Sequence, residues 1–175
     1  MIIKSQAIEG VFLIDIQKNV DERGSFSRIF CERELKESGI DMSIKQINLC
    51  ENLKKNTLRG MHLQKEEYAE KKILTCLNGK IFDVIIDMRT NSKTYLKYFS
   101  VELSEENGYM LVIPEGMAHG YMTLTDNTKL LYYMSEFYNP DSAIGYRFDD
   151  PAFSIHWPQI EELIMSDKDK NWKYI

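Results

Sequence analysis

Two short segments of the chain hold histidines beside residue types that acid–base chemistry uses. The first, Arg59-Gly-Met-His-Leu-Gln64, reads as a strand, and alternate strand residues share a face, so His62 and Gln64 are expected to point the same way. In the second, Pro114-Glu-Gly-Met-Ala-His-Gly120, a turn leads His119 into another strand. Either histidine could move a proton at the rim of a cavity, and either could instead be a buried histidine that hydrogen-bonds to a neighbour.

A metal site at these histidines is not expected. The chain has only three histidines and no His-x-His pair, and the residue two after His62 is Gln64. A catalytic metal usually needs several converging histidines and carboxylates. The three cysteines, Cys31, Cys50 and Cys76, are scattered and form no Cys-x-x-Cys, so neither a disulfide framework nor a zinc finger is predicted. Free thiols of this kind are typical of a protein of the reducing cytoplasm.

Other charged and phenolic residues could join the histidines, and each also has an ordinary interpretation. Lys72 begins a strand, where a lysine is usually solvated but could point inward and bind an anion. Tyr132 and Tyr133 are adjacent in a strand and must face opposite sides, so one could reach a cavity while the other packs. Asp169 lies in a polar tail segment and matters to the histidines only if that tail folds over them.

Arg23 and Arg59 each stand beside a glycine, in Asp21-Glu-Arg-Gly24 and Leu58-Arg-Gly60. Two guanidinium groups in an acidic protein could hold a diphosphate, because their geometry matches phosphate oxygens. Surface salt bridges are the competing explanation.

Short strands dominate the expected secondary structure. They are predicted at Val11–Ile16, Ser25–Phe30, Ile44–Leu49, Ile73–Leu77, Lys80–Asp87, Tyr95–Leu103, Gly108–Ile113, Gly120–Leu124 and Lys129–Met134. Asn78-Gly79 between two of these runs predicts a β-hairpin. Helices are predicted only at Glu32–Ser38, which ends at Gly39, and at Gln159–Met165 after Pro158. The pattern favours a β-sandwich or barrel with a small helical tail, in one domain spanning residues 1–175.

The composition excludes several other classes of protein. At 175 residues and 20.6 kDa, the chain fits one domain. Its 22 basic and 27 acidic residues give a net charge of −5 with no basic run, which argues against nucleic-acid binding. No apolar run approaches the roughly 20 residues that span a membrane, and no secretory signal is expected at the N-terminus.

Taken together, these segments resemble the dTDP-4-dehydrorhamnose 3,5-epimerase family of nucleotide-sugar epimerases. The resemblance covers almost the whole chain, and its most specific parts are Thr57-Leu-Arg-Gly-Met-His-Leu-Gln64, Ile113-Pro-Glu-Gly-Met-Ala-His-Gly120 and Asp150-Pro with Ile155-His-Trp-Pro158. It implies a cupin-like double-stranded β-helix, or jelly roll, that needs no metal or redox cofactor and acts as a homodimer. The implied reaction exchanges protons at carbons flanking the 4-keto group of a nucleotide-linked deoxyhexose.

The resemblance also implies a role for each candidate residue. His62 matches the general base, Asp169 the residue that orients it, and Tyr132 the acid that returns a proton on the opposite face of the sugar. Lys72 matches the cation that stabilises the enolate oxygen, with help from His119. The implied substrate-binding residues are Arg23 and Arg59 for the diphosphate, Gln46 and Asn48 near the nucleotide, and Phe26 and Tyr138 at the nucleobase.

The chain also departs from the family at positions of the recognition set. Arg28 and Ala143 stand where glutamates are common, Phe137 replaces a common tyrosine, and Cys50 replaces a common serine. The identity of the nucleotide and sugar, and inversion at C3, C5 or both, are therefore left open. The alternatives are a single-centre epimerase, a keto-isomerase of the same substrate class, and a non-catalytic sugar-nucleotide binding module.

Overall fold

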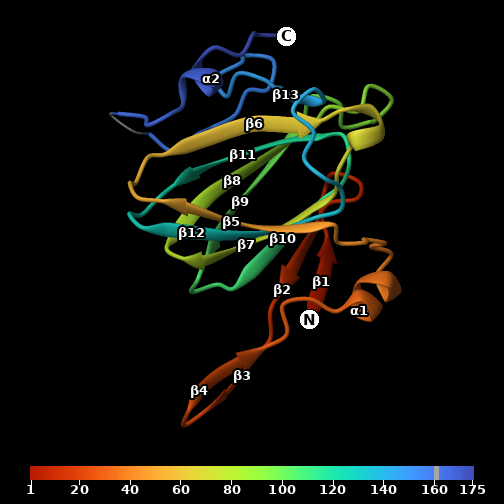
Figure 1. Ribbon diagram of the computed structural model, residues 1–175, viewed down its shortest axis with the longest axis vertical. Helices are drawn as coiled ribbons and strands as arrows, with labels where there is room; N and C mark the ends of the chain where they lie inside the picture. The colour runs from red at the N-terminus through yellow and green to blue at the C-terminus, as the bar shows by residue number, and fades with distance from the viewer. Residues whose placement is uncertain (160–161) are drawn as a thin grey trace.

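The computed structural model describes residues 1–159 and 162–175 and places two antiparallel sheets face to face (Figure 1). One sheet has six strands, in the order β1 (Ile2–Ser5), β2 (Phe12–Asp15), β10 (Tyr109–Ile113), β7 (Lys72–Asn78), β12 (Thr128–Met134) and β5 (Gln46–Asn52). The other has five, in the order β13 (Ala143–Gly145), β6 (Leu58–Gln64), β11 (Met117–Thr123), β8 (Lys80–Asp87) and β9 (Tyr98–Ser104). The short elements are the hairpin of β3 (Lys18–Asp21) and β4 (Gly24–Ser27), the helices α1 (Glu32–Glu37) and α2 (Asp167–Lys170), and the 3-10 turn η1 (Glu66–Tyr68).

Three apolar layers explain why the central strands are continuously hydrophobic. Between the sheets lies a core that includes Leu74, Ile85 and Leu130, all fully buried. The outer face of the six-stranded sheet packs under α1 and the loop after it, while the outer face of the five-stranded sheet is covered by the segment around Phe148–Trp157. A strand buried on both faces loses the usual alternation of polar and apolar residues, as β8 shows.

The fold class is as expected, because the strands form the two facing antiparallel sheets of a jelly roll. The hairpin predicted at Asn78-Gly79 is wrong. There β7 passes into β8, but β7 pairs with β10 and β12, whereas β8 pairs with β9 and β11. Gly79 has a φ of +78°, so the turn signal is real, but it carries the chain from one sheet to the other.

The helix predicted at Gln159–Met165 is also wrong where the structure describes it. Residues 159 and 162–165 are not helical, and residues 160–161 lie outside the described part of the chain. Ile164 instead exchanges backbone hydrogen bonds with the chain at the start of β6, donating to Asn56 before the strand and accepting from Leu58, its first residue, both at 2.9 Å. The helix of the tail is α2, whose cap is the side chain of Ser166, which accepts from the Asp169 amide.

The β3–β4 hairpin, which we call the arm, projects away from both sheets at the lower end of Figure 1. All four residues of β3 are exposed, and Val20 and Phe26 are 74% and 73% exposed. An apolar surface of this kind on an isolated two-stranded hairpin contributes nothing to the core of its own chain.

Candidate functional site

A cavity of about 660 Å³ opens between the two sheets, where β5 and β12 face β6 and β13. Strands of both sheets line it, and α2 forms a further wall. The lining includes Gln46, Asn48, Cys50, Arg59, His62, Gln64, Glu70, Lys72, His119, Tyr121, Tyr132, Tyr138, Ala143, Lys168, Asp169 and Trp172. Every residue predicted to be catalytic is among them. The volume is in the range that small-molecule sites usually have.

The register of β6 against β11 brings the two histidines together. His62 and His119 are direct partners in this antiparallel pair, so their side chains share the face that lines the cavity. Next to them Gly60, with a φ of +134°, lies against Gly120, and a Cβ on Gly60 would overlap the backbone of β11. The glycine after Arg59 is thus required by close strand packing.

The tail does fold over His62. The Asp169 Oδ1 atom lies 2.6 Å from His62 Nε2 and accepts from Trp172 Nε1 at 3.3 Å, while the Gly60 amide donates to Oδ2 at 3.4 Å. Burial by itself would raise the pKa of Asp169, but these hydrogen bonds and the nearby imidazole outweigh it and hold the pKa below its ordinary value. The carboxylate therefore stays ionised and orients the ring of His62.

A second histidine–carboxylate pair lies deeper, and its acidic member is absent from the sequence prediction. His119 Nε2 is 2.9 Å from Oδ2 of Asp83, and both residues are buried. Asp83 interrupts the apolar run of β8, from Ile81 to Ile86, which is the one signal that could have singled it out.

Lys72 points inward, so the interpretation of a solvated lysine at the start of a strand is wrong. Its Nζ atom is 2.9 Å from Oε1 of Glu70, and only 10% of its side chain is exposed. Glu70 is buried and accepts a hydrogen bond from Gln64 Nε2 at 3.1 Å. Glu70 was not foreseen, because nothing local distinguishes it from its acidic neighbours in Glu66–Glu70.

The two tyrosines of β12 face opposite sides, as predicted. Tyr132 packs toward the cavity with its ring 6.0 Å from that of His119, edge to face, whereas Tyr133 belongs to the outer core under α1. Desolvation raises the pKa of Tyr132 well above its ordinary value. Its hydroxyl is therefore protonated near neutral pH and able to donate.

Four of the six predicted substrate-binding residues line the cavity: Gln46, Asn48, Arg59 and Tyr138. Arg59 is held by Asn52, whose Oδ1 accepts from Nε at 2.9 Å. Arg23 and Phe26 do not meet them, because both lie on the arm, where the Arg23 guanidinium pairs with Asp21 at 2.5 Å. Arg28, the departure noted above, pairs with Glu34 at 2.7 Å. Within one chain, then, the diphosphate clamp predicted from two arginines is not assembled.

Neither a metal cluster nor a membrane-crossing helix is seen in the described part of the chain. Across residues 1–159 and 162–175, no group of three or more His, Cys, Asp or Glu side chains is placed to hold a metal ion. Nor does any helix within these ranges have the length and apolar character needed to cross a bilayer.

A two-sheet jelly roll whose cavity joins a histidine–carboxylate pair, a lysine and a protonated tyrosine defines a class: cupin-like proteins equipped for acid–base chemistry. The family model described as dTDP-4-dehydrorhamnose 3,5-epimerase matches residues 5–175. The chain belongs to this family. The resemblance, and the isomerase class that it implied, are thereby confirmed.

Individual relatives agree with the family model. The dTDP-4-dehydrorhamnose 3,5-epimerase of Sinorhizobium fredii is 39% identical over 98% of this chain and 88% of the relative. The crystal structure of dTDP-4-dehydrorhamnose 3,5-epimerase from Elizabethkingia anophelis superposes with a TM-score of 0.95 at 34% identity, covering 99% of this chain and 96% of that one. A dTDP-6-deoxy-D-glucose-3,5-epimerase from Legionella pneumophila, in complex with dTDP-4-keto-L-rhamnose, has a TM-score of 0.94 at 32% identity, covering 98% and 91%.

Proposed function

We propose that this protein epimerises a nucleotide-linked 4-keto-6-deoxyhexose, of the dTDP-4-dehydro-6-deoxyglucose type, in deoxysugar biosynthesis of the dTDP-rhamnose kind. The observation that carries the proposal is the placement of His62 and Tyr132 on opposite walls of one cavity, since β6 and β12 belong to different sheets. Inversion of a carbon needs a base on one face and an acid on the other. The ligand of the Legionella relative supports the substrate class.

The first step is removal of the proton α to the ketone. His62 Nε2 is held by Asp169, and 42% of the His62 side chain is exposed, so the ring is oriented yet open to substrate. As the C–H bond breaks, its electrons form the enolate and the proton goes to the imidazole. Asp169 stabilises the imidazolium that results.

The negative charge then builds on the 4-oxygen. Lys72 and His119 lie on facing sheets beside the cavity and serve as the cation and hydrogen-bond donor for this oxygen. In a water-poor cavity such donors are far more effective than in bulk water. Tyr132 then gives its hydroxyl proton to the carbon from the face opposite His62, which inverts the centre.

We also propose that the protein works as a homodimer in which the arm of one protomer reaches the cavity of its partner. The exposed apolar and charged residues of the arm, Arg23 and Phe26 among them, support this arrangement. So does β5, whose exposed Ile47 and Leu49 lie on an edge to which no strand within the described ranges adds. Light scattering is expected to give twice the chain mass.

Mixing two inactive variants tests the shared site. In a heterodimer of His62→Ala and Arg23→Ala chains, one cavity has both its own His62 and the partner's wild-type arm. Activity is therefore expected to return on mixing and exchange of subunits. Two variants that stay inactive together would contradict the exchange of arms.

We further infer one domain over residues 1–175, because the family model runs through residues 5–175. A cytoplasmic location also remains our proposal, supported by three cysteines that are all free.

Proton NMR in D₂O with dTDP-4-keto-6-deoxyglucose tests the reaction itself. Deuterium at both C3 and C5 of the product supports the double epimerase, and deuterium at one carbon supports the single-centre alternative. A carbonyl moved to the neighbouring carbon would identify a keto-isomerase. Tight binding of the nucleotide sugar without any exchange would leave only the non-catalytic binding module.

A further inference from the structure

Gln64 is buried beside the cavity, and the reaction as derived above makes no use of it. It ends β6, the strand that also carries Arg59 and His62, and it is only 3% exposed. An amide placed there must satisfy both its donor and its acceptor groups inside the protein. Its partners are what make it informative, because they belong to two separate parts of the site.

Toward the chemistry, the Gln64 side chain restrains the carboxylate that holds the lysine. Nε2 donates to Oε2 of Glu70 at 3.1 Å, while the other oxygen of Glu70 lies 2.9 Å from Lys72 Nζ. The carbonyl of Tyr68, in the turn that leads to Glu70, also lies 3.0 Å from Nε2, whose two hydrogens are shared among its acceptors. Since Glu70 and Lys72 are both buried, a small shift of this carboxylate moves the ammonium group directly.

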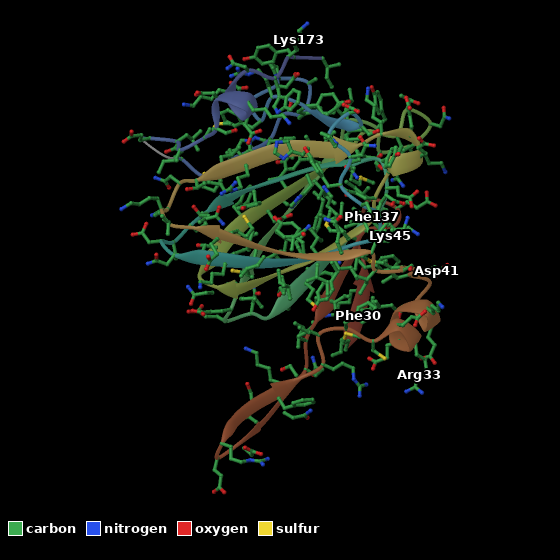
Figure 2. The ribbon with its side chains drawn as sticks, viewed as in Figure 1. Phe30, Arg33, Asp41, Lys45, Phe137 and Lys173 are labelled. Atoms are coloured by element: carbon green, nitrogen blue, oxygen red, sulfur yellow. The ribbon has the colours of Figure 1, made fainter. Side chains whose placement is uncertain are left out.

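Toward the nucleotide, the same amide fixes the loop that carries Tyr138. Nε2 donates to the Phe137 carbonyl at 3.1 Å, and Oε1 accepts from the Asn139 amide at 2.6 Å, so the bonds flank Tyr138 on both sides. The outer side of this loop rests on Lys45, whose Nζ lies 5.4 Å from the centre of the Phe137 ring, and Figure 2 shows these two side chains together.

We propose that Gln64 is a positioning residue that couples the enolate-stabilising Lys72 to the nucleotide-binding loop at Tyr138. The inference rests on the proposed function, from which it takes the role of Lys72, and on the family resemblance, which places Tyr138 at the nucleobase. Only an amide can do this, since the position needs an acceptor for Asn139 and donors for Glu70 and Phe137. Binding of the nucleotide part of the substrate thus sets the position of the Lys72 ammonium group beside the reacting carbon.

Gln64→Met keeps the length of the side chain and removes all its hydrogen bonds. We expect kcat to fall about tenfold to a hundredfold and KM to rise about tenfold, since misplaced catalytic groups commonly cost this much. Thr75→Val is the matched control: it removes one buried hydrogen bond, to the Tyr109 carbonyl at 3.1 Å, outside the site. It is expected to lower the unfolding temperature while kcat and KM stay at wild-type values.

Double variants separate coupling from simple destabilisation. If Gln64 acts through Glu70, the Gln64→Met/Glu70→Gln double variant has a kcat little lower than that of Gln64→Met. If Gln64 also acts through the loop, the Gln64→Met/Tyr138→Ala double variant has a KM little higher than that of Tyr138→Ala. Fully multiplicative losses in both pairs would overturn the inference. So would a Gln64→Met enzyme with kcat and KM within twofold of wild type.

Gln64→Glu serves if the methionine variant does not fold. It keeps the acceptor for Asn139 but loses both donors, so kcat is expected to fall more than KM rises; unchanged kcat would contradict the inference. Lys72→Ala, assayed alongside, keeps the two proposals distinguishable. If Lys72→Ala is inactive while the Gln64 variants have normal kinetics, only the coupling by Gln64 is contradicted. If Lys72→Ala is active, the proposed role of the lysine is contradicted.

Discussion

The two histidine–carboxylate pairs of the cavity are neighbours in one strand register and yet differ in how far their side chains are exposed. In the His62–Asp169 pair the imidazole is 42% exposed and the carboxylate 6%; in the His119–Asp83 pair the values are 6% and 0%. A base must reach a carbon-bound proton and then hold it, so the open ring suits it. A donor to an oxyanion must be fixed before the reaction begins, so the closed ring suits that task.

The carboxylates of the two pairs are also held in different ways. Asp83 is part of β8, a strand in the middle of a sheet, and its position follows from the sheet itself. Asp169 lies in α2, in the C-terminal tail, and accepts hydrogen bonds from Trp172 of the tail and from the Gly60 amide of β6. The His62–Asp169 pair is therefore the more adjustable of the two, and the following experiments probe that difference.

The largest expected effect is that of His62→Ala. Exchange of the α-protons into D₂O is expected to fall by about 10³-fold or more at both carbons, because general-base catalysis typically contributes up to about 10⁴-fold. Proton NMR of the recovered sugar measures it. His119 is too enclosed to replace His62 in this variant. Near-native exchange would therefore show that His62 is not the base.

Tyr132→Phe is expected to separate exchange from inversion. The base remains, so α-protons still wash out, but epimerised product is expected to fall by about 10²-fold because the opposite-face donor is gone. Phenylalanine keeps the packing of the ring against His119. The measurement is the ratio of deuterium incorporated to product epimerised, and an unchanged ratio would make Tyr132 a packing residue only.

Asp169→Asn is expected to lower kcat about a hundredfold with little change in KM, because the amide no longer orients His62 or balances its charge. Stability supplies an independent readout. The pKa of Asp169 is lowered in the folded state, so the ionised carboxylate contributes to the free energy of unfolding at pH values above its unfolded pKa of about 4. That contribution is lost as the pH falls through the folded pKa. Acid unfolding of the variant should therefore depend less steeply on pH below about 4 than that of wild type.

Asp83→Asn is expected to have a smaller effect, about tenfold on kcat, because Lys72 still stabilises the enolate oxygen when His119 is less well held. The amide preserves the shape of the buried side chain, so the fold should remain. A loss equal to that of Asp169→Asn would remove the distinction between the open and the closed pair.

Exhaustive EDTA treatment is expected to change nothing. The prediction rests on the missing His-x-His pair and on His62 and His119, each of which is engaged by a single carboxylate. Comparing kcat before and after chelation tests it. Loss of activity that a divalent ion restores would overturn the metal-free mechanism.

Local pattern was enough for most strands, although it missed β1, β3 and β13. It was also enough for the shared face of His62 and Gln64 and for the opposite faces of Tyr132 and Tyr133, because these depend on the two-residue period of a strand. The hairpin at Asn78-Gly79 failed for an informative reason. A turn signal says that the chain bends, but only the pairing of both strands with other partners decides which sheet each one joins.

What the sequence determined by itself was the β-rich type of fold, which follows from periodicity, and the family, which follows from motifs in order along the chain. What the tertiary structure alone decided was which groups meet. Asp169 lies 107 positions from His62, Asp83 lies 36 from His119, and Arg23 stays on the arm, away from Arg59. Contacts at such separations depend on how sheets, tail and arm pack, and no local pattern encodes that packing.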